Sequence, residues 1–135
     1  ILEMTGMLKV TRGMLPLYAV PTTAGTGSEV TIAAVVTDVA ASRKLAIVDP
    51  RLMPRAAALD GRLMTGLPPD ITAATGMDAL THNVESYLSP AYHPLCDGIA
   101  LEGLRVGARA LVTAVKEPGN LQARADMMMS SMMGA

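Results

Sequence analysis

The sequence contains no phenylalanine and no tryptophan, and its aromatic residues are three tyrosines among 135 residues. Half of the residues are nevertheless apolar and only 17% are charged, a composition that excludes an intrinsically disordered chain. The length is sufficient to bury a core. That core must be built from Ala, Val, Leu, Ile and 11 Met, and methionine fills irregular gaps between helices and strands.

The sequence also lacks an excess of charge of one sign: the net charge is −1, and no block of basic residues stands out. With few aromatics to stack on bases, we expect no nucleic-acid binding. No run of about 18 apolar residues exists, so we expect no membrane span. The single cysteine, Cys96, excludes an internal disulfide and suits a cytoplasmic protein. Because the chain opens at Ile1 and stops at Ala135 within an expected helix, we expect a piece of a longer polypeptide.

Up to Leu67 the sequence is typical of short strands separated by Gly, Pro and Thr. Four segments are candidate strands: 15–20, 30–36, 45–48 and 56–59. The second and third are separated by a short polar stretch, which predicts a β-hairpin, and Asp49-Pro50 ends it. Their nearly continuous apolar runs predict strands that are buried on both faces, as in an α/β sheet.

After Leu67 the apolar residues recur at helical spacing. They predict one helix from an N-cap at Asp70 to about Leu88, a second over 97–116 and a third from about residue 121. Asp97 is expected to cap the second helix, and its neighbour Cys96 is expected to be a small buried side chain rather than a metal ligand or nucleophile. The methionines at 127–129 and 132–133 are expected to fill the core.

Two segments could carry chemistry. The first, PTTAGTGSE at 21–29, follows a predicted strand; its glycines allow a tight turn, and its hydroxyls and N–H groups could hold phosphate or ribose oxygens. A simple turn between strands explains it equally well. In the second segment, Asp78 and His82 lie four residues apart on one helix face and could bind one divalent cation. An ordinary surface contact is the alternative explanation of that pair.

Together these segments resemble the iron-containing (group III) alcohol dehydrogenase family. The resemblance rests on the loop PTTAGTGSEVT at 21–31 and on the run TAATGMDALTHNVESY at 72–87. Between them, several residues fall where the family's pattern would place them: Lys44, Val48-Asp49-Pro50, Pro54, Asp60 and Leu67-Pro68-Pro69.

The resemblance implies an α/β region followed by an all-helical one. Residues 1–68 would be the C-terminal part of a dinucleotide-binding α/β domain, and residues 69–135 the N-terminal part of an all-helical metal-binding domain. NAD or NADP would be contacted by five residues: Thr22, Thr23, Thr26, Thr31 and Lys44. Asp78 and His82 would be two of four ligands of Fe²⁺, for which Zn²⁺ is a common substitute.

The implied reaction is hydride transfer between a small alcohol or its aldehyde and the nicotinamide, with the metal as Lewis acid on the alcohol oxygen. The family's other two ligands are histidines, and the second histidine of this chain, His93, matches neither. Because two protein ligands hold a cation weakly, we expect the isolated chain to be inactive. We also expect it to form a homo-oligomer through an open sheet edge.

Two further interpretations stay open at this point. The chain could be a truncated, non-catalytic relic that folds or self-associates without binding a cofactor tightly, and motifs alone do not separate this from an enzyme segment. A phosphate-binding module without redox chemistry is disfavoured, because such a module has no use for Asp78 and His82 together.

Overall fold

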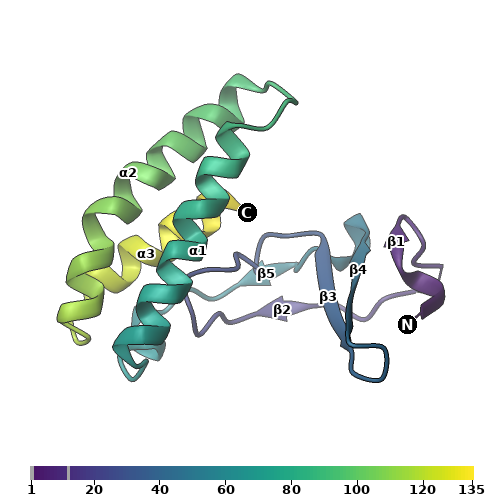
Figure 1. Ribbon diagram of the computed structural model, residues 1–135, viewed down its shortest axis with the longest axis horizontal. Helices are drawn as coiled ribbons and strands as arrows, with labels where there is room; N and C mark the ends of the chain where they lie inside the picture. The colour runs from purple at the N-terminus through teal and green to yellow at the C-terminus, as the bar shows by residue number, and fades with distance from the viewer. Residues whose placement is uncertain (1, 12) are drawn as a thin grey trace. The chain divides into compact units, whose positions relative to one another are not determined.

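The computed structural model describes residues 2–11 and 13–135, which form two compact units (Figure 1). One unit contains the described residues of 2–19 together with 28–57, and the other contains 20–27 together with 58–135. Short strands make up the first unit and three α-helices dominate the second, so the predicted class, α/β followed by all-α, is confirmed. The division of a longer protein into domains between residues 68 and 69 stays a prediction.

The strand unit contains a three-stranded sheet in the order β1-β4-β3, formed by Gly6–Met7, Arg43–Val48 and Ala33–Asp38. β3 and β4 pair antiparallel, with Ala33 opposite Val48, which confirms the predicted hairpin. β1 pairs with β4 in parallel. A second sheet consists of two short parallel strands, β2 (Tyr18–Ala19) and β5 (Ala56–Ala57), which are shorter than predicted. Two 3₁₀ helices complete the unit, η1 (Leu2–Met4) and η2 (Pro50–Leu52).

The hairpin strands are not buried on both faces, so that prediction is wrong. Exposed and half-buried residues alternate along β3, and in β4 only Leu45 and Ile47 are buried. Alternate side chains of a strand point to opposite faces, so the two buried residues Leu45 and Ile47 lie on the same face of the sheet. Asp49 ends β4 as predicted: its carboxylate is buried and accepts from the backbone N–H groups of Arg51 at 3.0 Å and Val10 at 3.3 Å.

The helical unit is formed by α1 (Pro69–Tyr87), α2 (Pro94–Lys116) and α3 (Leu121–Gly134), which contact one another pairwise, and by the 3₁₀ helix η3 (Gly61–Met64) (Figure 1). Its core consists of alanine and methionine side chains, as the composition predicts: Ala24, Met64, Ala79, Ala110, Ala114, Ala123, Met127 and Met128. Met129, by contrast, is exposed. No helix among residues 2–11 and 13–135 is long and apolar enough to cross a membrane.

On α1, the buried residues are small or polar rather than the large apolar ones. The apolar stripe that predicts α1 is exposed at Ile71, Met77 and Leu88, whereas the buried residues of that helix are Thr72, Gly76, Ala79 and Asn83. The Asn83 amide is fully buried and donates to the carbonyl oxygens of Ala79 and Ser130, each at 2.8 Å. Helices with such faces approach closely, which is how a core without large rings can be dense.

Both helix starts differ from the prediction. α1 begins at Pro69 with Pro68 as its N-cap, and Asp70 lies in the first turn instead of capping it. A proline at the first helical position has the required φ and lacks only an N–H that would be unsatisfied there. α2 begins at Pro94, and its cap is His93, whose Nδ1 accepts from the Cys96 N–H at 3.5 Å. Asp97 is therefore not the cap, and Cys96 is exposed rather than buried.

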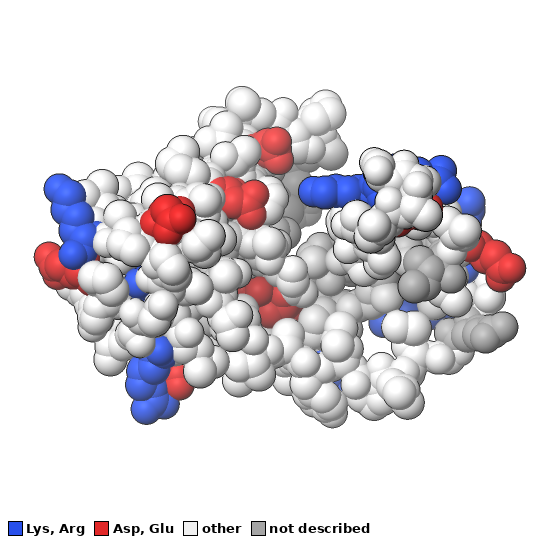
Figure 2. Space-filling model, turned by 60° about the horizontal axis from the view of Figure 1, so that its bottom comes forward, with Lys and Arg blue, Asp and Glu red and all other residues white. Residues whose placement is uncertain are grey.

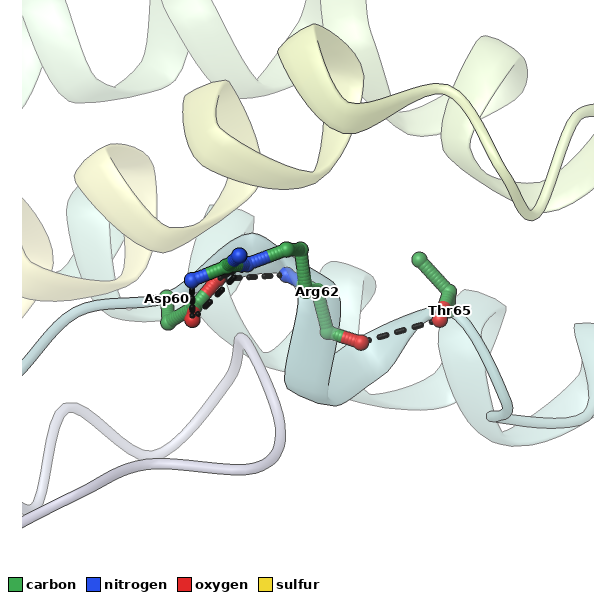
Figure 3. Close-up of polar contacts among 3 residues, drawn as sticks. All are labelled: Asp60, Arg62 and Thr65. Carbon is green, nitrogen blue, oxygen red and sulfur yellow. Dashed lines mark hydrogen bonds and ion pairs between the residues drawn. The ribbon is translucent and has the colours of Figure 1, made fainter.

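The segment that leads into α1 is held by local polar contacts around η3 (Figure 3). The Asp60 carboxylate caps η3, accepting from the Arg62 backbone N–H at 3.0 Å and from its guanidinium at 2.7 Å. These hydrogen bonds hold the pKa of the Asp60 carboxyl below its ordinary value. The Thr65 hydroxyl donates to the Arg62 carbonyl at 2.9 Å.

On the face drawn in Figure 2, acidic and basic side chains are interspersed, in keeping with the near-zero net charge.

Two glycines of α2 provide a test of the close helix contacts. A Cβ on Gly103 would lie 2.8 Å from both the Asn83 Cγ and the Met133 Cβ, whereas one on Gly98 would meet nothing within 4 Å. We expect Gly103→Ala to lower the free energy of unfolding by about 1–3 kcal/mol through overpacking. Gly98→Ala should raise it by about 0.5–1 kcal/mol, because glycine weakens a helix interior. Urea unfolding, monitored by circular dichroism, measures the free energy of unfolding of both variants. Equal changes in the two variants would contradict the packing described.

Candidate functional site

Asp78 and His82 come together on one face of α1, as the sequence predicts. The His82 Nε2 lies 3.8 Å from the Asp78 Oδ1, which is too long for a hydrogen bond. The side chain of His82 is 33% exposed and that of Asp78 is 44% exposed, so both groups can be reached from solvent. The pair therefore presents a ring nitrogen and a carboxylate oxygen to the same partly open space.

The second nitrogen of the His82 ring is held by the loop at 20–27. His82 Nδ1 lies 3.2 Å from the carbonyl oxygen of Gly25, which is 57 residues away in the sequence. Gly25 is buried against α1: a Cβ there would lie 2.7 Å from the Thr75 carbonyl oxygen and 3.2 Å from the Asp78 Oδ2. Only a residue without a side chain can approach the helix at this point.

A second glycine fastens the same loop to α3. The Gly27 N–H donates to the buried Ser131 Oγ at 3.2 Å. Gly27 has a φ of +56°, and a Cβ there would lie 2.9 Å from the Ser131 carbonyl oxygen. One of the N–H groups that the sequence offered for binding phosphate is therefore already used within the protein. Gly25 and Gly27 thus hold the loop against α1 and α3, respectively.

The donor atoms of Asp78 and His82 lie close enough together to reach one shared cation. Metal–nitrogen and metal–oxygen bonds of about 2.1 Å allow two donors of the same ion to lie at most about 4.2 Å apart. The 3.8 Å between Nε2 and Oδ1 satisfies this limit. Among residues 2–11 and 13–135, however, no three His, Cys, Asp or Glu side chains gather closely enough to hold a metal ion. Glu85, one turn further along α1, does not complete the set.

The predicted cofactor residues divide between the two units. Thr22, Thr23 and Thr26 lie on the seated loop, where Thr22 and Thr26 are exposed and Thr23 is half-buried. Thr31 and Lys44 belong to the strand unit. The Thr31 Oγ1 accepts from the Ala33 N–H at 3.3 Å, and Lys44 is an exposed residue of β4.

A buried arginine lies behind the loop. Arg124 is almost fully buried, its Nη1 donates to the Thr72 Oγ1 at 2.9 Å, and its Nε donates to the Pro118 carbonyl at 3.1 Å. Burial lowers the pKa of its guanidinium. Arg124 lines a cavity of about 10 Å³ together with residues such as Ala24 and Thr75. A cavity of this size accommodates one water molecule rather than a substrate.

The sequence did not reveal the part played by the Gly25 carbonyl. The motif at 21–29 draws attention to hydroxyl and N–H groups, and a backbone acceptor leaves no mark on residue type. The one available signal is the glycine itself, because a glycine is required wherever a backbone approaches another element closely.

Two sequence models of one family match the chain in succession. The model described as "Iron-containing alcohol dehydrogenase" matches residues 2–61, and the model described as "Fe-containing alcohol dehydrogenase family, C-terminal" matches residues 72–135. The second match contains Asp78 and His82, and the first contains the 20–27 loop.

Individual proteins give the same result. The chain is 45% identical to 4-hydroxybutyrate dehydrogenase of Cupriavidus necator over 130 residues, which are 96% of the chain and 34% of that protein. Its structure resembles the alcohol dehydrogenase from Oenococcus oeni, with a TM-score of 0.93 and 37% identity, over 98% of the chain and 35% of that structure.

It also resembles sulfoacetaldehyde reductase from Bifidobacterium kashiwanohense in complex with NAD⁺, with a TM-score of 0.85 and 39% identity, over 93% of the chain and 34% of that structure. The chain spans about a third of the length of the curated relatives that it matches. Motifs, family models and relatives all agree, and the chain belongs to the iron-containing alcohol dehydrogenase family.

Proposed function

We propose that this chain is a segment of a metal-dependent alcohol dehydrogenase, which transfers a hydride between a small alcohol or its aldehyde and NAD or NADP. The observation that carries the proposal is the pair of metal-binding donors on α1, with His82 Nε2 and Asp78 Oδ1 3.8 Å apart and open to solvent. Family membership supports the reaction class.

Asp78 and His82 would hold the cation, Fe²⁺ or Zn²⁺. When bound, such a cation supplies Lewis-acid stabilisation of negative charge on the alcohol oxygen. The carboxylate contributes negative charge that attracts a divalent ion, and the imidazole contributes a neutral nitrogen that suits both iron and zinc. The contact with Gly25 restricts rotation of the ring, so its second nitrogen keeps a fixed direction.

The loop at 20–27 would contact the dinucleotide through Thr22, Thr23 and Thr26. Hydroxyl groups donate to and accept from phosphate and ribose oxygens, and a loop seated on two helices loses little freedom when it binds. A relative of known structure was solved in complex with NAD⁺, which supports a dinucleotide as the ligand class. Contacts from Thr31 and Lys44 to the cofactor are part of the same proposal.

The number of donors limits what the chain can do by itself. A catalytic site of this kind has three protein ligands as a rule, and the described residues bring two together. Water would fill the remaining positions of a cation held here and would compete with the alcohol. This observation also favours the second candidate function, a non-catalytic relic that folds without tight cofactor binding.

The isolated chain should therefore show no alcohol-dependent formation of NADH or NADPH in the usual enzymatic range of about 1–1,000 s⁻¹, with Fe²⁺ or Zn²⁺ added. Absorbance at 340 nm measures the reaction over a panel of short alcohols. Turnover in that range, abolished by Asp78→Ala or His82→Ala, would contradict the expected inactivity. His93→Asn is the matched control, since asparagine retains a capping side chain.

Removal of one hydroxyl tests the cofactor loop. Thr23→Val preserves the shape of the side chain and removes its hydrogen bond, so NAD⁺ should bind about 2–10-fold more weakly, equivalent to about 0.5–1.5 kcal/mol. Isothermal titration of NAD⁺ into the chain measures the change. Thr113→Val on α2 serves as the control and should bind like the wild type. Equal affinity of all three proteins would remove Thr23 from the proposed contacts.

We also propose that the chain is cytoplasmic and self-associates through an open sheet edge. β3 lies at the end of the strand order β1-β4-β3, and such an edge can pair with another strand. Sedimentation equilibrium over a range of protein concentrations should show a dimer or larger species. A monomer at all concentrations would refute the self-association.

A further inference from the structure

We propose that Gly25 is a positioning residue that selects the tautomer of His82 and thereby prepares its Nε2 for a metal ion. The inference rests on the proposed function for its metal, but the tautomer itself is a property of the chain. It concerns the loop that sequence reasoning assigned to the cofactor alone, and it gives that loop a second task at the metal donors.

The first step is the direction of the hydrogen bond. A carbonyl oxygen can only accept, so the contact of 3.2 Å between Gly25 and His82 requires the proton on Nδ1. In the neutral ring the other nitrogen, Nε2, then carries the lone pair. That lone pair is what a cation needs, and Nε2 is the atom that lies 3.8 Å from the Asp78 carboxylate.

The second step is that α1 alone would favour a different arrangement. If Nε2 carried the proton, the ring could turn to donate it to the negatively charged Asp78 one turn away. That hydrogen bond would leave Nε2 without a lone pair for a cation. The carbonyl of Gly25 opposes this, because it holds the ring from the other side. A buried acceptor that fixes the second nitrogen of a ligating histidine is a recurrent feature of metal sites.

The third step is the reason for glycine at this position. A Cβ would lie 2.7 Å from the Thr75 carbonyl oxygen and 3.0 Å from the Thr75 Cβ, so alanine must push the loop away from α1. The carbonyl moves with the loop, and the hydrogen bond to Nδ1 is lost. The anchor between Gly27 and Ser131 makes the displacement harder to absorb within the loop.

The chain contains two histidines, and they provide an internal comparison. His93 Nδ1 accepts from the Cys96 N–H, so its proton must be on Nε2, the opposite tautomer. Long-range proton–nitrogen NMR of the neutral rings distinguishes the two forms without any metal. We expect Nδ1–H for His82 and Nε2–H for His93, assigned with His82→Gln and His93→Gln. Nε2–H as the main form of His82 would overturn the proposal.

Substitution of the glycine then tests its role. In Gly25→Ala, the Nε2–H form of His82 should gain population, and Zn²⁺ alone, titrated while the His82 ring signals are followed, should bind about 10–100-fold more weakly. Gly66→Ala is the matched control, since a Cβ there meets nothing within 4 Å, and it should leave both readouts unchanged. A folded Gly25→Ala protein with the tautomer and Zn²⁺ affinity of the wild type would overturn the proposal.

Two more results separate this inference from the proposed function. If the wild type shows the Nδ1–H form but no response to Zn²⁺, the metal assignment fails and the selection of the tautomer stands. If Gly25→Ala does not fold, Ser131→Ala removes the other anchor of the loop and should shift the His82 tautomer in the same direction. An unchanged Nδ1–H form of His82 in a folded Ser131→Ala protein would count against the loop as the cause of the tautomer.

Discussion

The approach of the Gly25 backbone to helix α1 is the contact on which the candidate site depends. It joins segments 57 residues apart and is allowed because no Cβ stands between the loop and Thr75. The same contact gives His82 its hydrogen-bond partner and seats the loop that carries the predicted cofactor threonines. Site geometry and loop position are therefore consequences of one steric constraint rather than two independent features.

That constraint recurs throughout the helical unit. Without phenylalanine or tryptophan, dense packing has to come from short distances between backbones instead of large side chains. Gly103 faces Asn83 and Gly107 faces Ser130, so α2 approaches α1 and α3 closely at these two polar residues. Asn83 illustrates the result: it is fully buried, and its amide bridges α1 and α3. A larger residue at either glycine would push α2 away from these side chains.

The sequence predicted the presence of each α-helix, the hairpin and the pairing of Asp78 with His82, because these follow from periodicity and short-range spacing. It did not predict the helix starts, since Pro68 and His93 replaced the aspartates that usually cap helices. It also did not predict which face of α1 packs, because hydrophobicity pointed to Ile71 and Met77 while glycine and alanine determine how closely helices approach. The Gly25 carbonyl was invisible for a similar reason: a long-range backbone contact depends on the fold.

The partial exposure of the two donors on α1 has two opposite effects on cation binding. Solvent access lets a cation reach Nε2 and Oδ1 without a conformational change, but the high dielectric constant of water weakens the attraction of the carboxylate for it. Additional ligands would replace water in the coordination sphere, and burial would lower the local dielectric constant. Both changes would strengthen the binding of the cation. Under the proposed function, the chain contributes donor identity and ring orientation. The strength of binding depends on how many further donors surround the pair.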